Sequence, residues 1–155
     1  MSNFIAKKNM TYSIIAADWQ AHRESLRKIR DIVFIQEQQV PIADEWDDKD
    51  ETAMHFLVVN AQGEAVACAR VLLENKLLHV GRVAVLTEYR QAGIGRRLMQ
   101  FILEWSVKEH PDYKVYLHAQ TSRIAFYEHL NFIAHGNVFM DAGIPHIEMW
   151  YEDKE

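Results

Sequence analysis

The sequence predicts an α/β fold, a mixed and mostly antiparallel sheet with helices on both faces. Three observations favour this class. Short apolar runs bounded by turn residues alternate with two long segments whose apolar residues recur every three or four positions. A segment with two glycines, residues 90–96, joins one apolar run to the second of these helical segments. The chain of 155 residues suits a single domain with a sizeable core, and we expect that domain to span residues 1–155.

The chain begins with a predicted strand and a long helix. Residues 10–16 alternate enough between apolar and polar side chains to form the strand. Asp18 is the expected N-cap of a helix over residues 19–39, because its carboxylate can accept a hydrogen bond from the first helical turn. Pro41 then ends this helix. Its buried face is formed by Leu26, Ile29, Val33 and Val40.

Three strands follow as an antiparallel meander. They are expected at residues 55–60, 65–74 and 77–85. Turn-forming residues at 60–63 separate the first two, and a tight turn at Asn75 and Lys76 separates the second two. Gly81 lies inside the last strand, where an interior glycine often marks a β-bulge.

The second half of the chain alternates helix and strand. A long helix is predicted over residues 92–110, and the strand after it, residues 114–119, is parallel to the preceding strand because a helix connects the two. A short helix over residues 122–130, capped by Thr121 or Ser122, comes next. The final strands are expected at residues 132–139 and 147–151, with a turn at residues 143–146. The buried stripe of the long helix consists of Ile94, Leu98, Phe101, Ile102 and Trp105.

Composition excludes several classes of protein. The net charge of −5 argues against a general nucleic-acid surface. No run approaches 18 apolar residues, so no membrane partner is expected, and residues 1–13 lack the apolar core of a signal peptide. Cytoplasmic location is therefore the expectation. Cys68, the single cysteine, cannot form an internal disulfide and is expected to be a buried strand residue. His146 and Glu148 are too few ligands for a metal site.

The segment at residues 90–96 has the features of a phosphate cradle. Gly93 and Gly95 let backbone N–H groups approach a bulky anion, and the helix N-terminus that follows adds unpaired donors and partial positive charge. Two other nucleotide motifs do not fit. The dinucleotide fingerprint requires a third glycine where Leu98 stands, and a P-loop requires Lys where Arg96 follows the second glycine. The alternative is an ordinary turn between strand and helix.

The pattern R-x-x-G-x-G after a V-x-V strand end resembles motif A of the GNAT superfamily of acyl-CoA-dependent N-acyltransferases. The predicted element order, β-α-β-β-β-α-β-α-β-β, is similar to that of the same family along nearly the whole chain. The resemblance implies that acetyl-CoA is the cosubstrate, that the loop amides bind its pyrophosphate, and that the strand backbone at Val83–Val85 bonds the pantetheine arm. The implied CoA-binding residues are Val83, Ala84, Val85, Arg90, Gln91, Ala92, Gly93, Ile94, Gly95, Arg96, Gln120 and Phe126.

Residues 123–132 resemble the family's motif B, which commonly ends FYEKLGF. Tyr127 falls on the position that protonates the departing thiolate in many members, and a modest shift from its ordinary pKa near 10 would make that transfer favourable. Alone, it would be interpreted as a core aromatic residue. Gln120 stands where many members carry Asn, and Asn131 replaces a glycine.

The resemblance implies a direct transfer in which a neutral amine attacks the thioester and forms a tetrahedral intermediate, stabilised by backbone amides. A base, often through water, then takes the amine proton. The candidate bases are Glu37, Glu45, His79, His118 and His146. His118 is on the strand next to the expected slot, and His146 in the C-terminal turn could reach over the acceptor site, so these two join Tyr127 as candidate catalytic residues.

Residues 42–51 are strongly acidic and surround Trp46. They form either a solvated loop or an electrostatic lip that attracts a cationic amine. In the resembled family the equivalent segment borders the acceptor site. This segment and the GIPHIEM sequence near the C-terminus resemble a GNAT subgroup of poorly defined substrate.

The sequence thus predicts an N-acetyltransferase acting on a primary amine, of a small molecule or a protein, with a mild preference for a cationic acceptor. Two other classes stay open. One is a non-catalytic acyl-CoA-binding sensor, and the other is a protein-interaction module that uses the acidic loop. A homodimer is common in the resembled family, and sheet edges offer a route to one.

Overall fold

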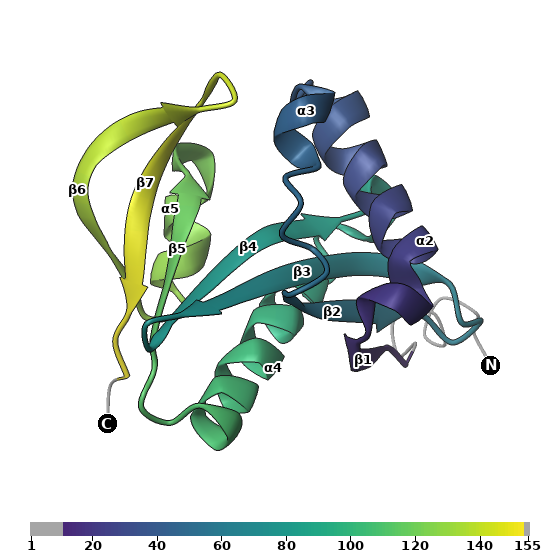
Figure 1. Cartoon of the computed structure of the whole chain (residues 1–155), viewed down its shortest axis with the longest axis horizontal. Helices are drawn as coiled ribbons and strands as arrows, with labels where there is room; N and C mark the ends of the chain where they lie inside the picture. The colour runs from purple at the N-terminus through teal and green to yellow at the C-terminus, as the bar shows by residue number, and fades with distance from the viewer. Residues whose placement is uncertain (1–10, 154–155) are drawn as a thin grey trace.

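A computed structural model describes residues 11–153, and its centre is a seven-stranded sheet (Figure 1). The strands are β1 (Ser13–Ala17), β2 (Met54–Val59), β3 (Ala65–Glu74), β4 (Leu77–Val85), β5 (Lys114–Gln120), β6 (Phe132–Asp141) and β7 (Ile144–Tyr151). The helices are α2 (Trp19–Arg30), the π-helix η1 (Asp31–Glu37), α3 (Ile42–Glu45), η2 (Thr87–Tyr89), α4 (Ile94–Glu109), η3 (Thr121–Arg123) and α5 (Ile124–Glu128).

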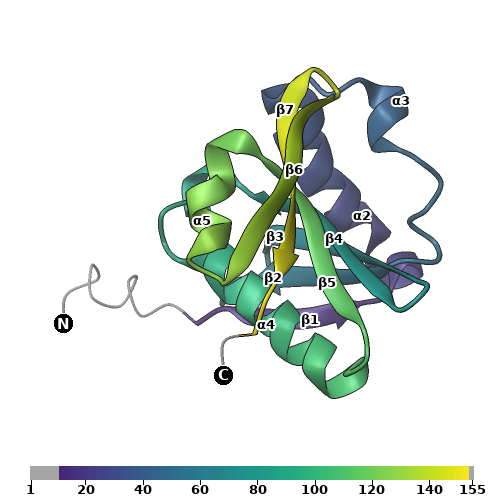
Figure 2. The same ribbon diagram turned by 90° about the vertical axis from the view of Figure 1, so that its left-hand side faces the viewer.

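The sheet order is β1-β2-β3-β4-β5-β7-β6, and β4 and β5 are the parallel pair. The α/β class and the mostly antiparallel sheet are therefore confirmed. Helix α2 covers one face of the N-terminal strands, while α4 and α5 cover the opposite face (Figures 1 and 2). No described helix covers the α2 face of β5, β7 and β6, so that face remains open over the C-terminal strands.

The predicted meander is confirmed. Strands β3 and β4 begin and end at the predicted residues, and the turn between them places Asn75 and Lys76 at φ 54° and 60°. Asp18 caps α2, with its Oδ2 accepting a hydrogen bond from the Ala21 N–H at 3.0 Å. The first strand starts at Ser13, and residue 10, its predicted start, lies outside the described residues, as does most of the segment considered for a signal peptide.

Several boundaries differ from the prediction. The first helix widens into the π-helix η1 after Arg30 and ends before Pro41, because Gln39 turns left-handed at φ 64°. The short helix predicted over residues 122–130 is instead η3 and α5, which together span residues 121–128, and neither Thr121 nor Ser122 caps them through its side chain. The final hairpin turns earlier than predicted, at residues 142–143, so that Pro145 and His146 lie in β7.

A bulge in β4 separates this strand from β5. The register of β3 against β4 shifts by one residue after Gly81, and the left-handed residue is Arg82, with φ 52°, rather than the glycine. The pairing of β4 with β5 stops at Val80 opposite Leu117. Beyond this point the two strands diverge (Figure 1).

No helix within residues 11–153 is long and apolar enough to cross a membrane.

Candidate active site

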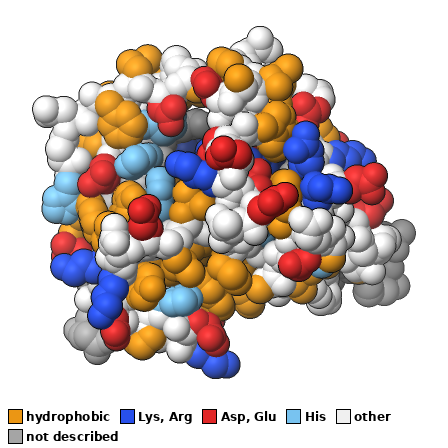
Figure 3. Space-filling model, in the orientation of Figure 1, with side chains coloured by type: hydrophobic (Ala, Val, Ile, Leu, Met, Phe, Trp, Pro, Cys, Tyr) orange, Lys and Arg blue, Asp and Glu red, His pale blue; other side chains and the backbone are white. Residues whose placement is uncertain are grey.

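A groove of about 610 Å³ lies where β4 and β5 separate. The glycine loop and the end of β4 line one part of it, and the π-helix and the β6–β7 turn line another. Histidine side chains gather beside a basic side chain on the open face (Figure 3). The groove therefore joins the predicted phosphate loop to the uncovered face of the C-terminal strands.

The loop has the geometry of an anion cradle. Gly93 is the N-cap of α4 in the left-handed region at φ 78°, and no side chain caps the helix there. The N–H groups of Ile94, Gly95 and Arg96 belong to the first turn and have no intrahelical acceptor. A Cβ placed on Gly93 would meet nothing within 4 Å, so there is open space beside these donors. Gln91 is also left-handed, at φ 63°. The residues present fit a phosphate group.

Arg90, which the resemblance assigns to cofactor binding, is ion-paired with Glu37 of the π-helix η1. Its Nη1 and Nη2 lie 2.6 and 2.9 Å from the two carboxylate oxygens of Glu37 on η1, and its Nε donates to the Val85 carbonyl at 2.8 Å. The hydrogen bond from Arg90 lowers the pKa of Glu37. Glu37 is thus a poor base, and Arg90 reaches a carboxylate rather than open solvent.

Tyr127 lines the same groove and is 8% exposed. Burial raises the pKa of Tyr127 to about 12, against the opposing positive charge of Arg123. The modest favourable shift expected from the sequence is therefore wrong in direction for the ligand-free protein, although the phenol is kept protonated. Gln120 donates to the side-chain oxygen of Gln38 at 2.9 Å, and the Phe126 ring would lie 3.6 Å from a Cβ placed on Gly95 in the loop.

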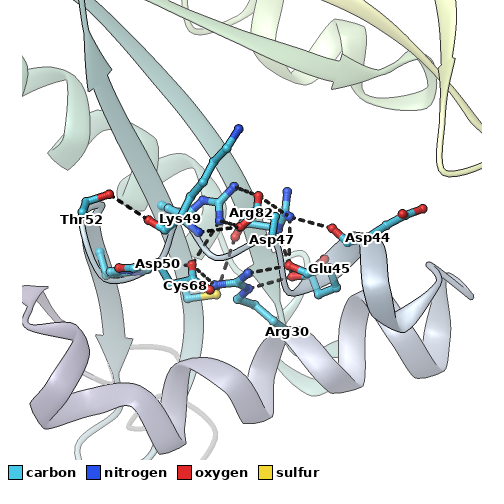
Figure 4. A network of polar contacts seen from close by, with 11 residues as sticks. Arg30, Asp44, Glu45, Asp47, Lys49, Asp50, Thr52, Cys68 and Arg82 are labelled. Carbon is cyan, nitrogen blue, oxygen red and sulfur yellow. Dashed lines mark hydrogen bonds and ion pairs between the residues drawn. The ribbon is translucent and has the colours of Figure 1, made fainter.

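The acidic segment is only partly solvated: three of its carboxylates are exposed, and the other three pair with arginines. Glu45 and Asp50 are 2% and 6% exposed, and Arg30 from α2 bonds both of them at 2.7 Å (Figure 4). Arg70 from β3 reaches Asp47 through both terminal nitrogens at 2.9 Å and Asp50 at 3.1 Å. These interactions join residues that are 15 to 23 positions apart and hold the loop against helix α2 and strand β3.

Arg82 completes this cluster from the β4 bulge (Figure 4). Its Nη2 donates to the Glu45 carbonyl at 3.0 Å and to Asp47 at 3.3 Å, and its Nε lies 3.0 Å from the Glu45 carboxylate without hydrogen-bond alignment. Three guanidinium groups thus face three carboxylates, which we call the buried charge network: Arg30, Arg70, Arg82, Glu45, Asp47 and Asp50. The Glu45 carboxylate is already paired with Arg30 and Arg82, so it is not available as a base.

The open face carries a cluster of histidines and aromatic rings. His79 stacks on Tyr116 at 4.4 Å between ring centroids, and His118 lies 4.9 Å from His79. Burial, with smaller effects of the nearby cations, lowers the pKa of His79 to about 4. His146 donates from Nδ1 to the Ile144 carbonyl at 2.7 Å and stacks on Phe139 at 5.9 Å. His118 and His146 both line the groove with Tyr127.

Two residues near His118 were not identified from the sequence as part of its surroundings. Its Nε2 lies 3.3 Å from Oε1 of Glu148, whose Oε2 accepts a hydrogen bond from the Trp150 indole at 2.7 Å. Strand alternation over residues 144–151 places Glu148 and Trp150 on one face and could have found them. Within residues 11–153, no group of three or more His, Cys, Asp or Glu side chains is arranged to hold a metal ion.

Comparisons with known proteins agree with this geometry. A family model described as an acetyltransferase (GNAT) domain matches residues 31–152. Protein ElaA of Escherichia coli is 36% identical over 129 residues, covering 81% of this chain and 84% of its own, and its crystal structure superposes with a TM-score of 0.80 over 92% of this chain and 99% of its own. A crystal structure of an acyl-CoA N-acyltransferase from Pseudomonas aeruginosa is 27% identical, with a TM-score of 0.79 over 93% of this chain and 100% of its own.

Bacillus subtilis YjcF, named as an uncharacterized N-acetyltransferase, is 30% identical over 122 residues, covering 78% of this chain and 86% of its own. The family model spans the glycine loop, the separated strands and the residues around Tyr127 alike. The fold, the groove and the sequence matches lead to one conclusion: this chain belongs to the GNAT family of acetyltransferases.

Proposed function

We propose that this protein transfers an acetyl group from acetyl-CoA to a primary amine. The observation that carries the proposal is the uncapped, left-handed start of α4 at Gly93, which opens onto the same groove as Tyr127 and the histidine cluster. Acetyl-CoA would supply the acetyl group as a thioester. An amine acceptor is the class on which the family generally acts.

The chain offers separate groups for the two ends of acetyl-CoA. The free amides of residues 91–96 would hold the pyrophosphate, since backbone donors at a helix N-terminus favour an anion. The edge of β4 that faces β5 has no strand partner after Val80 among the described residues. Backbone groups at Val83–Val85 could therefore bond an extended pantetheine arm there, apart from the Val85 carbonyl, which already accepts from Arg90.

Tyr127 would donate a proton to the departing sulfur. Its phenol stays protonated at neutral pH because burial raises its pKa to about 12. The departing thiolate would lie in the same buried surroundings, and burial also raises the pKa of its thiol. Burial of Tyr127 alone therefore does not make the proton transfer to sulfur unfavourable. The β4 bulge at Arg82 brings irregular backbone to the end of the paired region, where backbone amides would stabilise negative charge.

The acceptor's charge preference would depend on fewer carboxylates than the sequence suggested. Glu45, Asp47 and Asp50 are neutralised within the buried charge network. Asp44 and Asp141 are exposed and line the groove from α3 and from the β6–β7 hairpin. A cationic acceptor would be attracted by these two side chains.

Calorimetric titration tests cofactor binding. We expect micromolar affinity for acetyl-CoA, a similar affinity for dephospho-CoA, which keeps the pyrophosphate, and a large loss for S-acetylpantetheine, which lacks it. No binding of acetyl-CoA at millimolar concentration would contradict the proposal.

Thiol release is then measured with spermidine, kanamycin, Nα-acetyl-lysine and 2-phenylethylamine as probe amines. Turnover with any of them supports acetyl transfer. Tight acetyl-CoA binding without turnover across the panel would favour a non-catalytic acyl-CoA sensor instead.

A further inference from the structure

The position of His118 relative to the slot identifies it as a group that can meet the acceptor. Leu117 is the last residue of β5 that pairs with β4, so His118 comes directly where the strands part. Leu117 and Ala119 are buried beneath α4 and α5, and strand alternation therefore turns His118 to the open face. Its side chain lines the groove there and is 33% exposed.

A chain of hydrogen bonds fixes the orientation and tautomer of this imidazole. His118 and Glu148 are register partners on β5 and β7, which brings their side chains together. A carboxylate only accepts, so the 3.3 Å contact requires a proton on Nε2 of His118 and leaves Nδ1 as the acceptor nitrogen of the neutral ring. The Trp150 indole only donates, and its 2.7 Å bond holds the other oxygen of Glu148.

We propose that Nδ1 of His118 takes the proton of the acceptor amine and that Glu148 is its positioning residue, held in turn by Trp150. This inference rests on the proposed function. The transfer forms the bond between the amine nitrogen and the acyl carbon and breaks the carbon–sulfur bond. The proton from nitrogen goes to Nδ1 of His118, and the hydroxyl proton of Tyr127 goes to the sulfur. Solvent then carries one proton from His118 back to Tyr127, which restores both groups.

The other candidate bases are less suited by their contacts. Glu37 is held by Arg90, and Glu45 is buried between Arg30 and Arg82. His79 is a weak base because its pKa is about 4. His146 has a fixed tautomer, but among the described residues no carboxylate bonds its ring.

The charged and titratable groups around the His118 ring come from all neighbouring strands. His79 faces it from β4, Tyr116 lies beside it on β5, and Phe139 of β6 contacts its edge. Strand β7 supplies Glu148 and His146, while His135 of β6 is the register partner of Glu148. Arg70 and Lys49 act on His79 from farther away. Among these groups the negative charge comes from Glu148, 3.3 Å from the His118 ring.

The first test reads the tautomer of His118 from the NMR signals of its ring nitrogens in the protein without ligands. Wild type should carry the proton of the neutral ring on Nε2, because Glu148 accepts from that nitrogen. Glu148→Leu removes the acceptor, so the signals should change to those of a mixture of tautomers. Glu104→Leu, a matched change on the exposed side of α4, should leave the tautomer unchanged. An unchanged tautomer in Glu148→Leu would overturn the positioning role.

The second test uses the probe amine that is acetylated fastest among spermidine, kanamycin, Nα-acetyl-lysine and 2-phenylethylamine. His118→Ala should lower kcat about 100-fold or more while leaving acetyl-CoA affinity within threefold, and added imidazole should restore part of the rate. Glu148→Leu should also lower kcat, by a smaller factor than His118→Ala, with acetyl-CoA affinity again within threefold.

The two failures can be distinguished. A wild-type protein that acetylates an amine while His118→Ala keeps its full rate would overturn this inference alone. A wild-type protein that does not bind acetyl-CoA would overturn the proposed function, and the base assignment with it.

Discussion

Removing only the hydroxyl group of Tyr127 tests its proposed acid role separately from acetyl-CoA binding. Tyr127→Phe should lower kcat about 100-fold because the sulfur loses its proton donor, and the Kd of acetyl-CoA should stay within threefold because the ring is kept. Steady-state kinetics and calorimetry measure the two effects. Tyr113→Phe, a hydroxyl removed outside the groove lining, serves as control. Equal kcat in Tyr127→Phe and wild type would remove the acid role.

Gly95 tests the phosphate cradle at the level of one side chain. A Cβ at this position would lie 3.6 Å from Phe126 and 3.8 Å from Val85, which is ordinary contact, so alanine fits the ligand-free protein. Gly95→Glu should weaken acetyl-CoA binding at least tenfold, since it adds bulk and negative charge beside the free amides. Gly95→Ala should cause a smaller loss. Calorimetric affinities in the order wild type, Ala, Glu are expected, and equal affinity for all three would contradict the cradle.

At the scale of elements, the buried charge network ties α2, the acidic loop and the bulged strand together. Asp50 accepts from both Arg30 and Arg70, so Asp50→Asn leaves two buried guanidinium groups with a weakened partner. We expect a loss of about 3–5 kcal/mol in the free energy of unfolding, measured by urea denaturation. Asp48→Asn, on an exposed neighbour, should cost less than about 0.5 kcal/mol. A small loss in Asp50→Asn would show that the network is not structural.

The pKa of His79 on β4 predicts how the free energy of unfolding depends on pH. Burial, together with the nearby cations, lowers the pKa of His79 to about 4, so the folded protein resists taking a proton that the unfolded chain binds near pH 6.5. The free energy of unfolding should therefore fall as pH drops from 6.5 toward 4, by at most about 1.4 kcal/mol per pH unit for this group. His79→Phe should flatten this slope, as shown by thermal denaturation across that range. An identical slope in both proteins would contradict the assignment.

Asp50 in the buried charge network adds a second loss of stability, at lower pH than the loss from His79. Burial raises the pKa of Asp50, but Arg30 and Arg70 lower it by more, so its net pKa in the folded state is depressed. Its contribution is present above the ordinary carboxylate range near 4 and disappears as pH falls below it. The acid limb of the stability curve should therefore have two stages.

At the scale of the whole molecule, the π-helix η1 bridges the two sides of the groove. Glu37 bonds Arg90 of the loop, and the next residue, Gln38, accepts from Gln120 of β5. Glu37→Gln should release Arg90 toward the phosphates and raise acetyl-CoA affinity several-fold at low salt, with a smaller gain at high salt. Calorimetry at two ionic strengths measures this, with Glu104→Gln as the control. Weaker binding in Glu37→Gln would instead show that the pair holds the loop in shape.

The features that could be predicted from the sequence are local. Strands β3 and β4 are bounded by turn residues, so their ends were identified correctly, and the proposed phosphate loop lies within seven consecutive residues. The buried charge network could not be foreseen, because Asp47 meets Arg82 across 35 positions and the segment appears simply acidic. Likewise, Glu148 meets His118 across 30 positions, and only the strand register shows that they are partners. Long-range pairing, not propensity, decided these features.

The π-helix has a consequence for deletions in this segment. A π turn carries one more residue than the α-helical turn it replaces, so deleting one residue within Asp31–Glu37 would let the segment close as α-helix while the residues after the deletion keep their direction. Glu37 and Gln38 would then still face Arg90 and Gln120. A relative with a one-residue gap here should therefore keep both contacts on an α-helical turn.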